Sequence, residues 1–158
     1  GGMPVSKTTY RWWGYVKSVI RAYPELKREY DDLHEQAITA NVSGTGGGSG
    51  VSRGVESVAL RELPRPLQEE YDAVRKAITT TERMKSKTER LKIVKMVFWK
   101  RETNLRGAAT ALNISYETAV EYHRDFIKIT AFFMGRITAE ELTGSQKLAY
   151  KIQKHALK

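Results

Sequence analysis

The sequence predicts an all-α protein, because apolar residues recur at intervals of three or four along several stretches, as they do on one face of a helix. The stretches 10–23, 88–100 and 105–133 show this spacing clearly. A run rich in glycine and serine, residues 41–54, separates the first of them from the other two. We therefore expect an N-terminal helical hairpin, a flexible Gly-rich linker and a C-terminal helical bundle with a helix-turn-helix.

The N-terminal hairpin is expected within residues 3–40. A wide apolar face that includes Trp13, Val16 and Ile20 indicates its first helix. Proline suits the first turn of a helix, so we expect Pro24 to begin the second one. Apolar side chains then recur at helical intervals at Leu26, Tyr30, Leu33 and Ala37. The aromatic residues at the start of the hairpin either pack in a core or meet a partner or a second protomer.

The glycine-rich run predicts a flexible tether over residues 41–54, since it holds too few apolar side chains to offset the entropy lost on ordering. The helical domain is expected to follow over residues 55–136. It should open with a short helix over 55–63, which Pro64 and Pro66 break.

Two further helices should precede the helix-turn-helix. One passes through Tyr71, Val74 and Ile78, and the other is a largely buried helix over 88–100, with Lys92 and Lys95 toward solvent. The basic segment 137–158 is either a last helix or a frayed tail.

The charge of the chain favours a polyanionic partner. The formal net charge is +9, and residues 83–106 hold nine bases against two acids. Cysteine is absent, and the three histidines lie far apart, so we expect no disulfide, zinc site or other cofactor. No apolar run reaches the roughly 20 residues that span a bilayer, and no leader pattern opens the chain, so a cytoplasmic location is expected.

A helix-turn-helix is predicted over residues 105–124. Such a unit needs a small residue where its helices cross, a turn without bulk and apolar anchors at fixed offsets. Ala109 is the small residue, Asn113 suits a left-handed turn, and Ser115 can cap the second helix. The expected core of the motif is Leu105, Ala109, Leu112, Ile114, Ala119 and Tyr122.

Double-stranded DNA is the expected partner of this motif. The residues placed to read bases in the major groove are Ser115, Tyr116, Glu117, Val120, Glu121 and Arg124. Those placed nearer the phosphates are Lys100, Arg101, Arg106, His123 and Lys128. Two acids on the groove face would repel phosphate, but glutamate can accept a hydrogen bond from cytosine N4, which makes Glu117 and Glu121 candidate base readers.

The chain resembles the RinA/ArpU family of phage transcriptional regulators, whose C-terminal part is similar to region four of sigma factors. The matching stretches are IRAYPELKREYDDL, the glycine-rich spacer, AVRKAI, RLKIVKMVFWK and LRGAATALNISYETAVEYHRDF. The most specific element is the Asn-Ile-Ser core with Thr118 and Ala119. The resemblance implies a phage or prophage protein of a bacterial host cell that controls late or packaging genes and contacts RNA polymerase.

Two other functions compete with this interpretation. A small terminase-like packaging protein would also join a helix-turn-helix to assembly helices, and it predicts a ring of many protomers, whereas a regulator should be a monomer or a homodimer. A nuclease or recombinase would need clustered carboxylates or a positioned nucleophile. Adjacent acids such as Asp31 and Asp32 diverge on a helix, so we expect no catalytic residues and no enzyme.

Overall fold

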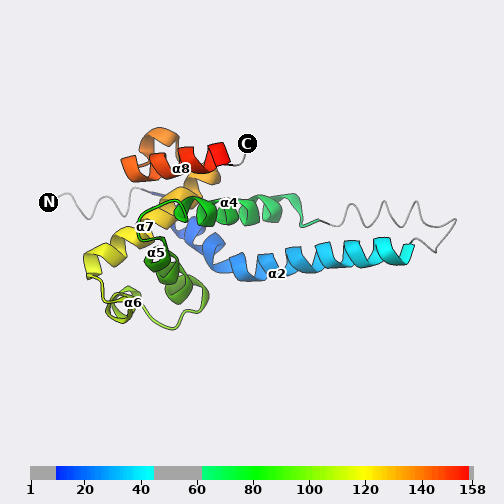
Figure 1. The fold of residues 1–158 in the computed structure, drawn as a ribbon, viewed down its shortest axis with the longest axis horizontal. Coiled ribbons are helices and arrows are strands. Elements are labelled where there is room, and N and C mark those ends of the chain that lie inside the picture. Colours follow the sequence, from blue (N-terminus) through cyan, green and yellow to red (C-terminus); the bar gives the residue numbers. More distant parts are fainter. Residues whose placement is uncertain (1–9, 45–61, 157–158) are drawn as a thin grey trace.

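The computed structural model describes residues 10–44 and 62–156, and every regular element within these ranges is a helix (Figure 1). The all-α prediction is therefore confirmed. In chain order the elements are α2 (Trp13–Gly44), α4 (Arg65–Thr81), α5 (Lys87–Val94), the π-helical turn η2 (Lys95–Trp99), α6 (Leu105–Leu112), α7 (Tyr116–Phe133), the short 3-10 helix η3 (Ala139–Glu141) and α8 (Gly144–Ala156).

The prediction of an N-terminal hairpin is wrong, because α2 is one helix that contains Pro24. A proline inside a helix lacks the N–H that would donate to the carbonyl four residues earlier, which here belongs to Ile20. The indole Nε1 of Trp99 donates to this carbonyl oxygen at 2.8 Å. Trp99 thus supplies the donor that proline lacks, and the helix continues past Pro24. Its first turns lie at an angle to the rest (Figure 1).

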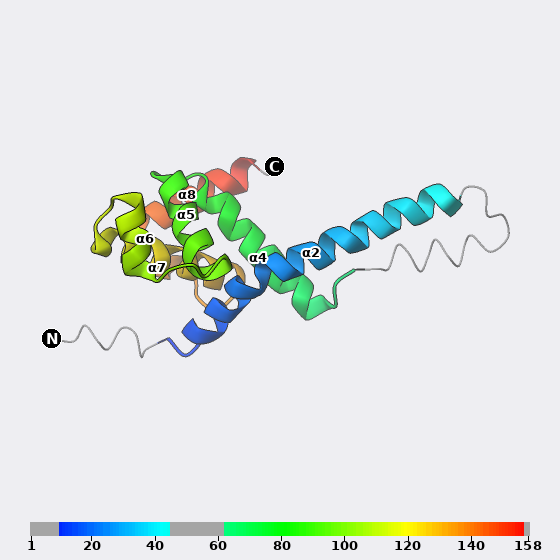
Figure 2. The same ribbon diagram turned by 90° about the horizontal axis from the view of Figure 1, so that it is seen from below.

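The partner of α2 is α4 rather than a second N-terminal helix. Tyr71 of α4 stacks on Tyr23 and on Tyr30 of α2, with ring centroids 5.6 and 4.4 Å apart. The two helices cross, and beyond the crossing the C-terminal part of α2 projects from the helical body (Figure 2). Side chains 34–36 on this part are exposed. Trp12 and Trp13, at the start of the described chain, pack against the main core. The N-terminal part of α2 therefore belongs to the helical body, and its C-terminal part is an arm.

The expected linker begins later than predicted, since residues 41–44 are the last turn of α2. The rest of the linker, and most of the short helix expected over 55–63, lie outside the described residues. Leu63 is described, and it is buried in a segment without helical structure that leads to α4. The helix through Tyr71, Val74 and Ile78 is confirmed as α4, with Pro64 as its N-cap.

The helix predicted over 88–100 is confirmed as α5 continued by η2, with Lys92 and Lys95 exposed as expected. The continuation is π-helical, because the Lys100 N–H donates to the Lys95 carbonyl five residues earlier, at 2.7 Å. Phe98 in this turn is buried in the core. Trp99, the next residue, meets α2.

The main core surrounds α7, which contacts α2, α4, α5 and α6. Buried residues of α7 face these helices, among them Phe126, Ile127 and Ile129. The basic segment after residue 136 forms η3 and α8, and α8 packs on α4. Within the described ranges, no helix is both long enough and apolar enough to cross a membrane.

Candidate nucleic-acid interface

The turn between α6 and α7 has the predicted local structure. Asn113 adopts the left-handed conformation, with φ 58° and ψ 44°, and ends α6. The Ile114 N–H donates back to the Ala109 carbonyl at 3.0 Å, which closes the turn. Ser115 is the N-cap of α7, and its Oγ accepts from the Thr118 N–H at 3.0 Å. These contacts begin the second helix immediately after the turn, as a helix-turn-helix requires.

A second, smaller core lies beneath this turn and matches the predicted set. Ala109 is 4% exposed, and it packs with Ile93, Ala108 and Ala119, which are fully buried. The partly buried residues around them are Met96, Val97, Leu105, Leu112, Ile114 and Tyr122. Because three of the four central residues are alanines, the backbones of α6 and α7 can approach closely.

Gly107 in α6 was not singled out by the sequence analysis. A Cβ at this position would overlap the Thr103 Oγ1, and its backbone N–H donates to the side chain of the N-cap Asn104 at 2.9 Å. Glycine therefore lets the segment before α6 lie close against the first turn. Asn104 as an N-cap was the available sequence signal.

One face of α7 remains exposed. Glu117, Glu121 and Arg124 are exposed, and Val120 between them is half-buried. Positions i, i+3, i+4 and i+7 share a helix face, so these four side chains form a single surface, which we call the α7 face. Its members are four of the six predicted base readers. The α7 face carries two acids and one base.

The other two predicted base readers have additional contacts. The Ser115 hydroxyl donates to Thr118 Oγ1 at 2.8 Å besides accepting the capping hydrogen bond, so it is used within the protein. Tyr116 is exposed, and the guanidinium of Arg106 lies over its ring, 4.0 Å from the centroid. A cation from α6 is thus held at the first turn of α7.

The predicted phosphate contacts fall into two groups. Lys100, Arg101 and Arg106 are exposed near the start of the motif. Arg101 has φ 51°, a left-handed conformation that turns the chain from η2 toward α6. Lys128 differs, because its Nζ donates to the Glu141 carbonyl at 2.8 Å and thereby fastens α7 to η3. The ammonium has two further N–H donors, so the phosphate contact of Lys128 stays a prediction.

The predicted role of His123 as a phosphate contact is corrected. Its ring stacks on Phe98, with centroids 5.0 Å apart and planes 2° from parallel. Burial, and then the positive charges of Lys17 and Arg21, lower the pKa of His123 to about 4. The imidazole is consequently neutral at pH 7. The sequence placed His123 by helix phase alone, and phase did not reveal Phe98 or the two cations of α2.

A buried polar network behind the α7 face was missed from the sequence. Asp125 Oδ2 accepts from Arg90 Nη1 of α5 at 2.7 Å, and Oδ1 accepts from Gln146 Nε2 of α8 at 2.7 Å. Arg90 Nε also donates to the Lys85 carbonyl, and its guanidinium lies over the Tyr122 ring. Arg90 had been counted with the basic stretch 83–106, but it is buried and neutralised by Asp125.

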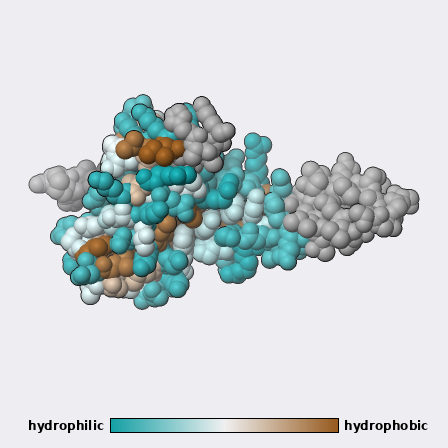
Figure 3. Space-filling model, in the orientation of Figure 1, coloured by the Kyte–Doolittle hydropathy of each residue, from teal (hydrophilic) through white to brown (hydrophobic). Residues whose placement is uncertain are grey.

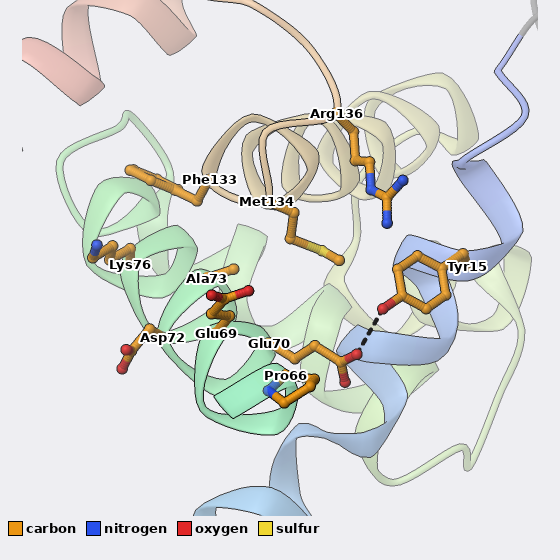
Figure 4. Close-up of a pocket in the computed structure, with 10 residues that line it drawn as sticks. All are labelled: Tyr15, Pro66, Glu69, Glu70, Asp72, Ala73, Lys76, Phe133, Met134 and Arg136. Carbon is orange, nitrogen blue, oxygen red and sulfur yellow. Dashed lines mark hydrogen bonds between the residues drawn. The ribbon is translucent and has the colours of Figure 1, made fainter. Parts of the chain in front are cut away.

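A surface hollow of about 280 Å³ lies elsewhere, between α2, α4 and the C-terminal end of α7 (Figure 4). Tyr15 donates to Glu70 Oε2 at 2.6 Å across it, and Arg136 lies over the Tyr15 ring at 5.1 Å. The hydrogen bond to Glu70 is the largest cause that raises the pKa of Tyr15. Glu70 and Arg136 thus both contact Tyr15, and none of the residues that line the hollow belongs to α6 or to the α7 face.

The described residues contain no group of three or more His, Cys, Asp or Glu side chains placed to hold a metal ion. No protein-family model matches the chain, and no curated protein or solved structure matches it either. The resemblance to phage regulators therefore stays a prediction.

Proposed function

We propose that this protein is a sequence-specific DNA-binding transcriptional regulator that acts through α6 and α7. The observation that carries the proposal is the α7 face. It is largely exposed and follows a tight left-handed turn, while buried residues on the other side of α7 pack in the core. A helix presented in this way is the element that enters the major groove in helix-turn-helix proteins.

The charges around the α7 face suit this role. Arg106 lies over Tyr116 at the start of α7, and Lys100 and Arg101 are exposed in the segment before α6, where all three can hold phosphates. Arg124 can donate to guanine, and Glu117 and Glu121 can accept from cytosine. The acids lower nonspecific attraction to DNA, so binding by this face should depend on base contacts more than on charge alone.

The biological setting of the proposal comes from the sequence resemblance. A relative of the RinA/ArpU regulators would act in the cytoplasm of a bacterial host cell on late or packaging genes of a phage or prophage. Contact with RNA polymerase and a homodimeric form belong to the same proposal.

Selection of genomic DNA tests the proposal most directly. The purified chain is mixed with fragments of the bacterial and phage genomes at two salt concentrations, and the DNA retained at the higher one is sequenced. We expect enrichment of one short site upstream of a gene. Loss of all fragments, or uniform retention without an enriched site, would contradict a sequence-specific regulator.

A packaging protein is the second candidate, and one observation favours it. Leu148 and Ile152 lie one turn apart on α8, with 61% and 42% of their surface exposed. An apolar patch lies over α8 in Figure 3. Exposed apolar pairs of this kind suit contacts between protomers. Light scattering separates the candidates, since a ring of many protomers indicates packaging and a monomer or dimer indicates regulation.

A further inference from the structure

Two cations of α2 lie beside α7. Helix α2 contacts α7, and Lys17 and Arg21 lie one helical turn apart on either side of Ile20. The Ile20 carbonyl accepts from Trp99, and the neighbouring Phe98 stacks on His123 of α7, so this turn of α2 is close to the middle of α7. The positive charges of both side chains contribute to lowering the pKa of His123. The segment that carries them is held firmly, because Val16, Val19 and Ile20 are buried and the Ile20 carbonyl accepts from Trp99. The backbone that carries Lys17 and Arg21 is therefore held in place by its packing.

Among the residues that the structure describes, no acidic side chain forms an ion pair with Lys17 or Arg21. The ion pairs formed by the described residues join Lys27 to Asp31, Arg65 to Glu69 and Arg90 to Asp125, and none includes Lys17 or Arg21. Lys17 is half-buried, and burial, followed by the charge of Arg21, lowers its pKa. His123 of α7 is neutral at pH 7 and adds no positive charge here. An anion at this place would offset the repulsion between the two cations.

The pair continues a row of cations along one side of α7. His123 follows Tyr116 by seven residues, which is two helical turns, so both lie on the same side of α7 about 10 Å apart. Arg106 lies over Tyr116, and the turn of α2 that carries Lys17 and Arg21 is next to His123, whose pKa their charges lower. The row therefore runs from α6 to α2 along the flank of the α7 face.

We propose that Lys17 and Arg21 bind phosphates of the DNA backbone, so that the DNA-binding surface includes α2. This inference rests on the proposed function. A helix in the major groove lies between two phosphate backbones, and a row of cations along its flank matches the evenly spaced charges of one strand. The sequence had assigned the start of α2 only to core packing or to a protein partner.

The test compares two double variants that each remove two positive charges. Lys17→Gln/Arg21→Gln removes the proposed contacts. Arg75→Gln/Lys76→Gln is the matched control, since both side chains are exposed on α4 and Lys76 lies near Phe133 at the far end of α7. The dissociation constant is measured over a salt series, on the enriched site and on a random duplex. Circular dichroism checks that both variants are folded.

We expect the α2 variant to bind both duplexes more weakly, with the slope of log K against log salt reduced by about 1.8, because each phosphate contact contributes about 0.9. The control should keep the wild-type slope. Lys17→Arg/Arg21→Lys, which preserves both charges, should also keep it. Ethylation of phosphates at the edge of the site should interfere with wild-type binding and not with the α2 variant.

The two proposals fail in different ways. If the wild-type chain binds no DNA, the proposed function is overturned. If the wild-type chain prefers its site and the α2 variant keeps the full salt slope, only the role of Lys17 and Arg21 is overturned. A slope reduced equally by the α2 variant and by the control would also overturn it, since the effect would then come from net charge.

Discussion

Trp99 donates its indole N–H to the carbonyl oxygen of Ile20, which is the acceptor that Pro24 leaves without a helical donor. One contact between residues 79 positions apart thus replaces the helical hydrogen bond that α2 lacks at Pro24. The same contact places η2 against α2, and η2 leads into the helix-turn-helix.

Replacing Trp99 should therefore leave the Ile20 carbonyl without a hydrogen-bond donor. We expect Trp99→Phe to lower the free energy of unfolding by about 1–3 kcal/mol, because it leaves a buried carbonyl unsatisfied. In a Pro24→Ala background the alanine N–H satisfies the carbonyl, so the same change should cost less. Urea unfolding of the four proteins measures this coupling. Equal costs in both backgrounds would show that Trp99 acts only through packing.

Replacing Asp125 should strongly lower the free energy of unfolding. Asp125→Ala leaves the buried Arg90 without a counter-charge, and we expect a loss of about 3–5 kcal/mol in unfolding free energy. Asp31→Ala is the control, because its ion pair with Lys27 is half-exposed and contributes about 0.5 kcal/mol. Denaturant titration compares the two.

The double variant Arg90→Met/Asp125→Leu distinguishes the cost of an unpaired buried charge from the cost of lost side-chain packing. It removes both charges, so we expect it to recover a large part of the stability lost in Asp125→Ala. If the double variant is no more stable than Asp125→Ala, the hydrogen bond from Gln146 is the dominant contact of the carboxylate.

His123 should make stability depend on pH. Its pKa of about 4 in the folded chain lies below the ordinary value of 6.5, so the unfolded chain binds a proton between these values and the folded chain does not. Its contribution is complete above pH 6.5 and falls as the pH drops toward 4. We expect a loss on the order of 3 kcal/mol over that interval.

His123→Phe tests this dependence. Phenylalanine can keep the stack on Phe98 and cannot titrate, so the variant should lose less stability than the wild type between pH 7 and 4. Urea unfolding at several pH values provides the comparison. Parallel pH profiles for the two proteins would mean that His123 does not titrate differently in the folded state.

Asn113 should tolerate only residues that accept the left-handed conformation. We expect Asn113→Gly to be close to neutral and Asn113→Val to cost about 1–2 kcal/mol, because a branched Cβ clashes with the backbone at φ 58°. The side chain is exposed, so lost packing contributes little. If both variants unfold at the same urea concentration, backbone strain does not limit the turn.

Two arginines should affect DNA binding differently. Arg124→Ala on the α7 face should weaken binding to the enriched site preferentially, by about 1–3 kcal/mol. Arg106→Ala should weaken binding to all duplexes and reduce the salt slope by about one unit. Gel shifts on specific and random DNA measure both. Equal losses for both variants on both duplexes would contradict the assignment of Arg124 as a base reader.

Local chemistry was predictable from the sequence. Asn113 and Ser115 act on neighbours within four residues of them, so a short pattern specified the turn and the cap. The six core positions of the helix-turn-helix followed from helical spacing for the same reason.

Roles set by distant residues were not predictable. The path of α2 through Pro24 depends on Trp99, and the neutral state of His123 depends on Phe98 and α2. Arg90 was counted among the basic residues of 83–106, but in the structure it is buried and forms an ion pair with Asp125. Each error treated a side chain as free because its partner is remote in sequence. One local signal was available for α2, since the intervals between Val16 and Tyr30 keep their phase across Pro24.

The continuity of α2 has a geometric consequence. The axis of a helix of 32 residues is about 48 Å long, and no turn interrupts it where the expected hairpin would have reversed the chain. Its short end is clamped by Trp99 and carries Lys17 and Arg21, while its long end projects from the body. The projecting end and the flank of α7 therefore belong to one continuous helix, whose first turns lie at an angle to the rest.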